Sequence, residues 1–231
     1  MDKAIKGDMS METLIQGALS TVRTIRRFPL TLLLPLLLMG SSVASATSVR
    51  EASVAEMTDK SAVIFEAVVV DVRAHKSLRG SIVTDVVFEV RDVIKGRVPQ
   101  RRLTLEFLGG EIPGARQSIA AMQYPELGEQ GIYFAESIDQ PLINPLYGWD
   151  QGRFLVQRDH AGVERVLTAG KRPVMDVQGS ESTFFAAPGV AVQLSTGVAS
   201  GVRATSAASA NEALSAGQFK QRIRNLLGAS P

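Results

Sequence analysis

Residues 62–73 read Ala-Val-Ile-Phe-Glu-Ala-Val-Val-Val-Asp-Val-Arg, and residues 82–96 read Ile-Val-Thr-Asp-Val-Val-Phe-Glu-Val-Arg-Asp-Val-Ile-Lys-Gly. The first run is rich in β-branched residues and too short to favour a helix. The second alternates apolar and polar residues, which is typical of a strand with one buried face. A polar connection ending in Gly80 separates them, so the pair is predicted to form a long antiparallel hairpin.

Shorter runs continue this pattern along the chain. Further strands are predicted at 103–107, 132–135, 153–157 and 164–167. The segment 111–130 is rich in Pro and Gly and is predicted to be a loop, with one or two helical turns at 115–122. Several short strands with turns between them, and no long helix among them, indicate an antiparallel barrel or sandwich.

The chain changes character towards its C-terminus. Residues 179–210 are dominated by Ser, Ala, Gly and Thr, which is typical of a low-complexity linker. A helix is predicted within 211–231, because Ser215 and Gln218 have capping-box spacing and Gly228 follows the last apolar residue. Its apolar face is expected to dock on the strands, with a membrane or a partner as the alternative surface.

The N-terminal segment has the three parts of a secretory signal peptide. Arg23 and the pair Arg26-Arg27 precede an apolar run at 30–39, and the small-residue triplet Ala44-Ser45-Ala46 follows it. We expect cleavage after Ala46 and a location in the periplasm or outside the cell. The apolar run is too short for a permanent membrane span, which needs roughly 20 residues. An uncleaved anchor and a twin-arginine signal remain as alternatives.

Charge and cysteine content narrow the function classes. The formal net charge of the whole chain is +2, and the predicted signal segment itself has two more basic than acidic residues, so the remainder is neutral. Neutrality argues against a nucleic-acid binder, which needs excess Lys and Arg to neutralise phosphates. The chain has no cysteine, which excludes disulfides and thiolate metal sites.

Catalytic and metal-binding motifs are scarce. The common nucleophile, zinc-protease and nucleotide-binding patterns are absent from the sequence. The two histidines, His75 and His160, are predicted in turns on different hairpins, so a zinc site of ordinary ligand number is hard to assemble. Glu66 interrupts an apolar strand face and would be a catalytic candidate if buried, whereas exposure on the outer face would leave it in water.

Three regions are candidates for binding a partner. Tyr147 and Trp149 lie in a Pro/Gly-rich loop, and aromatic residues in rigid loops are favoured binding anchors, although Trp149 is equally suited to cap the core. Glu111 begins the other long loop. Arg101 and Arg102 belong to a basic cluster that either grips an anionic partner or discourages pairing at a strand edge.

The strand order resembles that of netrin-type modules. The resemblance rests on Val63 to Val72, on Val86 to Gly96 and on Gly128-Glu-Gln-Gly-Ile-Tyr-Phe134. The chain is also similar to exported bacterial proteins that share these landmarks and a strand like Gly152-Arg-Phe-Leu-Val156. Netrin-type modules are OB-fold barrels and include the tissue inhibitors of metalloproteinases, so the resemblance implies a small OB-like barrel. The inhibitors chelate zinc through an N-terminal cysteine, which this chain lacks.

These observations predict an exported, mainly β binding module that needs no cofactor. The expected partner is another envelope or secreted protein, with a protease as one option, and the alternative function is a carboxylate-dependent hydrolase of the cell envelope. The predicted organisation is a signal peptide at 1–46, a lead-in at 47–61, the barrel at 62–178, the linker at 179–210 and the C-terminal helix at 211–231.

Overall fold

The computed structural model of the chain describes residues 49–179, 195–206 and 210–229. The predicted signal peptide and its cleavage position at Ala46 lie outside the described residues, and all the described residues belong to one compact unit. The elements are α3 (Val54–Lys60), β1 (Val63–Lys76), β2 (Ile82–Lys95), β3 (Arg102–Leu108), β4 (Gly110–Ile112), β5 (Ala115–Gln117), β6 (Gln130–Ala135), the 3-10 helix η3 (Trp149–Gly152), β7 (Arg153–Arg158), β8 (Glu164–Thr168), β9 (Val174–Val177), β10 (Val202–Ala204), the 3-10 helix η4 (Ala210–Glu212) and α4 (Ala216–Ala229).

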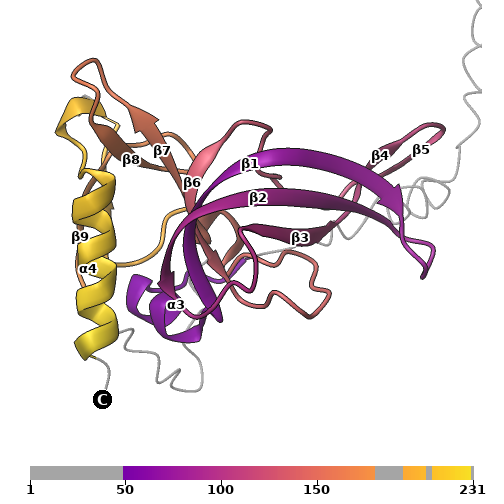
Figure 1. Cartoon of the computed structure of the whole chain (residues 1–231), viewed down its shortest axis with the longest axis horizontal. Helices are drawn as coiled ribbons and strands as arrows, with labels where there is room; N and C mark the ends of the chain where they lie inside the picture. The colour runs from indigo at the N-terminus through magenta and orange to yellow at the C-terminus, as the bar shows by residue number, and fades with distance from the viewer. Residues whose placement is uncertain (1–48, 180–194, 207–209, 230–231) are drawn as a thin grey trace, which may run out of the picture. The chain divides into compact units, whose positions relative to one another are not determined.

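A six-stranded antiparallel sheet organises the domain, in the order β3-β2-β1-β6-β7-β8 (Figure 1). β1 and β2 form the predicted hairpin, and Ser77 N donates to Ser81 O across its turn. Gly80 in this turn has a φ of 88°, which glycine adopts without strain. The four shorter predicted strands are β3, β6, β7 and β8, each within a residue or two of its expected bounds.

The sheet is bent but does not close. The register between β1 and β2 shifts at three places between Ile64 and Asp71. Such bulges bend a strand pair and increase its twist. Among the described residues, no ladder joins the outer strands β3 and β8, so the antiparallel β fold is confirmed while a closed barrel is not found.

Alternation along β1 sends its side chains into two cores, one on each face of the sheet. Val63 and Phe65 point into the first core, where Phe65, Phe88 and Tyr133 pack as an aromatic cluster with ring centroids 4.7 to 5.6 Å apart. Ile64 points into the second core, which β6, β7, β8 and the two helices share. Aromatic side chains of this size dominate the energetics of such cores.

α4 docks on the sheet, as predicted. Its capping box is present: Ser215 N donates to Gln218 Oε1, and Gln218 N donates to Ser215 Oγ. Phe219 is fully buried, and its ring centroid lies 4.7 Å from that of Phe154 on β7. The helix runs through Gly228 to Ala229, so Gly228 does not end it as expected. No helix among the described residues is long and apolar enough to cross a membrane.

Several short elements differ from the sequence expectations. The predicted lead-in contains α3, whose N-cap Ser53 accepts a hydrogen bond from Glu56 N. The predicted helical turns at 115–122 are wrong at their start, because 115–117 form β5, which pairs with β4. The described part of the predicted linker, 195–206, is packed rather than free: β10 pairs with β9, and Ala199 is buried.

Candidate functional site

Tyr147 and Trp149 lie together, but Tyr147 is tied to the fold. Its hydroxyl donates to Glu56 Oε1 at 2.8 Å, which links the loop to α3. Burial, and then the Glu56 carboxylate, raise the pKa of Tyr147 to about 12, so it remains a donor at neutral pH. Trp149 begins η3 with a φ of 61° and is partly buried. The two aromatic residues line a depression of about 310 Å³ that also includes Glu136.

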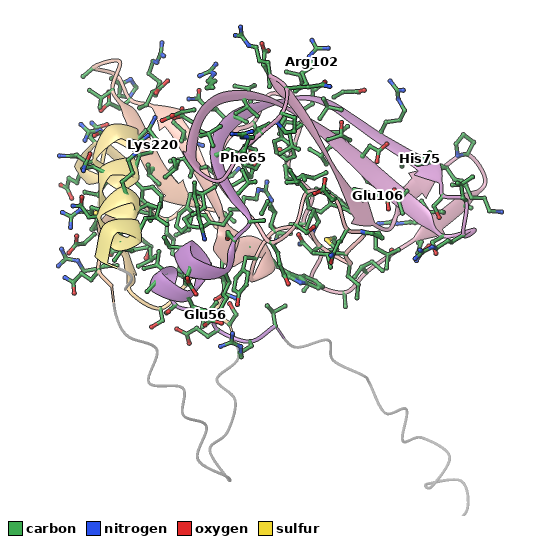
Figure 2. All side chains as sticks on the ribbon, turned by 60° about the horizontal axis from the view of Figure 1, so that its bottom comes forward. Glu56, Phe65, His75, Arg102, Glu106 and Lys220 are labelled. Carbon is green, nitrogen blue, oxygen red and sulfur yellow. The ribbon has the colours of Figure 1, made fainter. Side chains whose placement is uncertain are left out.

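The other predicted binding residues lie elsewhere. Glu111 is exposed on β4, 3.9 Å from an arginine of β5, and lines a different depression. Arg101 forms an ion pair at 3.2 Å with a glutamate of β2. Arg102 is exposed at the start of β3, and Figure 2 shows it far from Glu56, the partner of Tyr147. The structure therefore does not unite the predicted binding residues in one site.

Glu66 is buried, but its surroundings give it a structural role. Only 4% of the residue is exposed, and Gln130 Nε2 donates to its Oε1 at 3.0 Å. Lys220 Nζ of α4 lies 2.6 Å from Glu66 Oε2 and 2.9 Å from Asp92 Oδ2. Burial disfavours the charged lysine, but hydrogen bonds to Glu66 and Asp92 outweigh it and raise the pKa of Lys220. The carboxylate thus anchors the helix.

The two long connections on either side of β6 meet at the far end of the sheet from α4. Asn144 Nδ2 lies 3.5 Å from Met122 Sδ, and Leu108 N at the end of β3 donates to Ile143 O at 3.0 Å. The main chain of Ile143 is thereby fixed, while 53% of the residue is exposed. An ordered loop therefore presents an apolar side chain to solvent.

Beside this loop, the β1–β2 turn and β3 enclose a depression of about 580 Å³, which we name the hairpin-tip depression. That volume lies within the range of ligand pockets, about 300 to 1,000 Å³. Leu78, at the tip of the turn, is fully exposed and lines it. Other lining residues are His75, Glu106, Leu108, Leu142 and Ile143. Apolar side chains thus meet titratable groups at the free end of the hairpin.

Three of the titratable groups at this end form a cluster. His75 Nε2 lies 3.0 Å from Asp85 Oδ2, and one ligand atom from each of His75, Asp85 and Glu106 lies within 4.8 Å of the other two. The Lys76 carbonyl, and then the Asp85 and Glu106 carboxylates, raise the pKa of His75. Figure 2 shows His75 and Glu106 at the end of the sheet away from Lys220. His160, in contrast, is exposed in a separate turn.

Comparison of the chain with protein-family models, with curated proteins and with solved structures found no match. The geometry of the chain is therefore the basis for assigning its function.

Sequence reasoning missed the hairpin tip as a site because it placed His75 in a turn. His75 belongs to β1, and the short turn at 77–80 fixes its register opposite Val83. The sequence indicates that turn, so it could have predicted that His75 and Asp85 lie close together. It could not have predicted that Glu106 lies beside them, because the connection between β2 and β3 does not fix how these two strands are aligned.

Proposed function

We propose that the chain is an exported, non-catalytic binding module that contacts another envelope or secreted protein through the hairpin-tip depression. The observation that carries this proposal is the fully exposed Leu78, held beside the half-exposed Ile143 on the rim of an apolar-lined hollow. Exposed apolar groups gathered around a hollow are typical of interaction sites, whereas single scattered ones are not informative. The proposal therefore places the contact at the tip of β1 and β2.

The rigidity of the support favours binding. β1 and β2 pair along almost their whole length, and β3 pairs with the tip-proximal half of β2. Gln117 Oε1 accepts from Ile82 N at 2.8 Å, which holds β5 against the same end. A preorganised surface loses little conformational entropy when a partner docks. Lys76, Arg79 and Glu106 around the hollow provide both signs of charge for a polar rim.

The non-catalytic part of the proposal rests on the position of Glu66, the carboxylate that the hydrolase alternative needs. Its contacts with Lys220 and Gln130 occupy both oxygens within the part of the chain that the structure describes. Among the described residues, no second carboxylate faces Glu66 across an open site, as a hydrolase of this kind would need.

The proposal also includes export of the protein and a fold related to the OB barrels of netrin-type modules. Export is supported by the tripartite N-terminal sequence before Ala46. The OB-like kinship is supported by the bulged and bent β1–β2 pair, since barrels of this kind need strongly bent strands.

A capture experiment with purified chain and envelope extract tests the contact surface. Leu78→Ser should abolish capture of the partner, because it removes the exposed apolar group at the rim. Leu127→Ser is the matched control, since Leu127 is 70% exposed and lines a different depression. Trp149→Ala examines the anchor expected from the sequence. Loss of capture with Trp149→Ala but not with Leu78→Ser would move the interface to the smaller depression and contradict the proposal.

A further inference from the structure

The register of three neighbouring strands places His75, Asp85 and Glu106 on one face of the sheet. Asp85 on β2 lies directly opposite Glu106 on β3. His75 on β1 lies opposite Val83, two residues along β2 from Asp85. Residues two apart on a strand share a face, so the imidazole and both carboxylates project to the same side. Their convergence is fixed by backbone pairing and not by a mobile loop.

The cluster has two carboxylates and neither is paired with a lysine or an arginine among the described residues. Like charges directly opposite each other on neighbouring strands are destabilising. Within the described residues, Glu106 has no ion pair with a basic side chain, and Asp85 has only the histidine. Arg73, which lies opposite Asp85 in the register, instead pairs with Asp71 at 3.1 Å. A cation between the two carboxylates would remove the repulsion.

The spacing of the donor atoms suits a single metal ion. Zinc binds histidine nitrogen and carboxylate oxygen at about 2.0 to 2.2 Å, which places neighbouring ligand atoms roughly 3 to 3.5 Å apart. His75 Nε2 and Asp85 Oδ2 are 3.0 Å apart, and the Glu106 oxygen lies within 4.8 Å of both. To complete the site, the partly exposed Glu106 side chain would have to turn its carboxylate towards the other two ligand atoms.

The other nitrogen of His75 is oriented as in known metal sites. His75 Nδ1 lies 3.4 Å from the carbonyl oxygen of Lys76. Metal-ligating histidines commonly donate their second ring N–H to a carbonyl or carboxylate, which fixes the tautomer that leaves the first nitrogen free. A proton on Nδ1 would leave the Nε2 lone pair directed towards the carboxylates.

We propose that His75, Asp85 and Glu106 bind a divalent first-row transition-metal ion, with Zn²⁺ as the reference ion. One imidazole and two carboxylates suit this class, whereas Ca²⁺ takes six to eight oxygen ligands, more than the cluster supplies. Three protein ligands leave at least one coordination position for water or for a donor atom of a bound molecule. This inference goes beyond the proposed function and does not depend on it.

Isothermal titration of ZnCl₂ into the purified chain tests the proposal, with the protein prepared without a histidine tag and stripped with EDTA. At about pH 7.5 we expect saturable binding of one Zn²⁺ per chain. His75→Gln, Asp85→Asn and Glu106→Gln should each weaken binding roughly tenfold or more. His160→Gln and Glu111→Gln are the matched controls and should leave the affinity unchanged.

Three results would overturn the proposal. They are the absence of saturable binding, a loss of binding with His160→Gln, and unchanged affinity either in His75→Gln or in both Asp85→Asn and Glu106→Gln. Circular dichroism of each variant separates a folding defect from a lost ligand. In the wild-type chain, Zn²⁺ should also shift the Nε2 resonance of His75 and leave the ring nitrogens of His160 unmoved; the opposite pattern contradicts the assignment. The zinc titration needs no partner protein, so its result does not depend on the capture experiment. Repeating the capture with and without EDTA shows separately whether partner binding needs the metal.

Discussion

Replacing Lys220 with methionine should destabilise the docking of α4, because it leaves Glu66 without its cation. Lys220→Met keeps most of the side-chain volume, so the loss is chiefly electrostatic. The Glu66 side chain is 6% exposed and that of Lys220 is 16% exposed. Removing one member of a buried ion pair costs about 3 to 5 kcal/mol, because the other charge stays buried without compensation. Gln130 still donates to Glu66, so we expect a loss of about 3 kcal/mol, the lower end of that range.

Urea denaturation of both proteins, followed by far-UV circular dichroism, measures this loss. Lys60→Met is the matched control, because the Lys60–Asp59 pair is 63% and 57% exposed and such pairs contribute at most about 1 kcal/mol. Adding Glu66→Gln to Lys220→Met should restore part of the stability, since the buried charge is removed. A loss below about 1 kcal/mol for Lys220→Met would show that Glu66 is solvated, and the account of α4 would be wrong.

Three further predictions concern the same helix and the hairpin tip. Phe219→Ala should cost about 3 to 4 kcal/mol in the same urea assay, because it empties a fully buried site against Phe154; a loss near zero would contradict the docking. Burial opposes ionisation of Asp92, but Lys220 and Arg224 lower its pKa below 3.8, so its contribution to stability is complete above that pH and is lost as the pH falls through the lowered value. Asp92→Asn should therefore flatten the fall in stability on acidification, and an unchanged pH profile would refute the pairing. In a proton NMR titration, His75 should titrate above 6.5 and Asp85→Asn should lower that midpoint, whereas a midpoint at or below 6.5 would contradict the described contacts.

The fold was predictable where a local sequence pattern carries the signal. β1 is a long β-branched run, β2 alternates apolar and polar residues, and the hairpin follows from the turn between them. The capping box before α4 was also predictable from the sequence, because its two side chains accept hydrogen bonds from main-chain N–H groups of the same segment. In each case the information is local, so a single sequence suffices.

The missed elements depend on contacts between distant parts of the chain. α3 has only seven residues, too few to be stable alone, and Lys95 Nζ from β2 contacts the carbonyl oxygens of Thr58 and Asp59 at its end. β10 lies in a stretch of small residues, and its main-chain pairing with β9 supplies the order that side chains do not signal. The ion pair between Glu66 and Lys220 joins two positions far apart in sequence, and composition alone could not reveal it.

The candidate site shows the same division. The turn at 77–80 fixes His75 near Asp85, whereas Glu106 joins them only through the register of β3. Tyr147 is of a residue type that often anchors binding partners, yet its hydroxyl donates a hydrogen bond to Glu56 within the fold. An aromatic residue in a Pro/Gly-rich loop can therefore either form a binding surface or stabilise the fold through an intramolecular contact, and the sequence alone does not distinguish the two.

Site-specific photo-cross-linking in intact cells tests the central claim, that the hairpin tip is the contact surface, most directly. A photoreactive phenylalanine derivative placed at Leu78 should form a covalent adduct with one partner protein, because this side chain is fully exposed on the rim of the hollow. The same group at Leu127, also exposed, should give none. The claim would be contradicted if position 78 gave no adduct while position 149 did, or if positions 78 and 127 gave the same products.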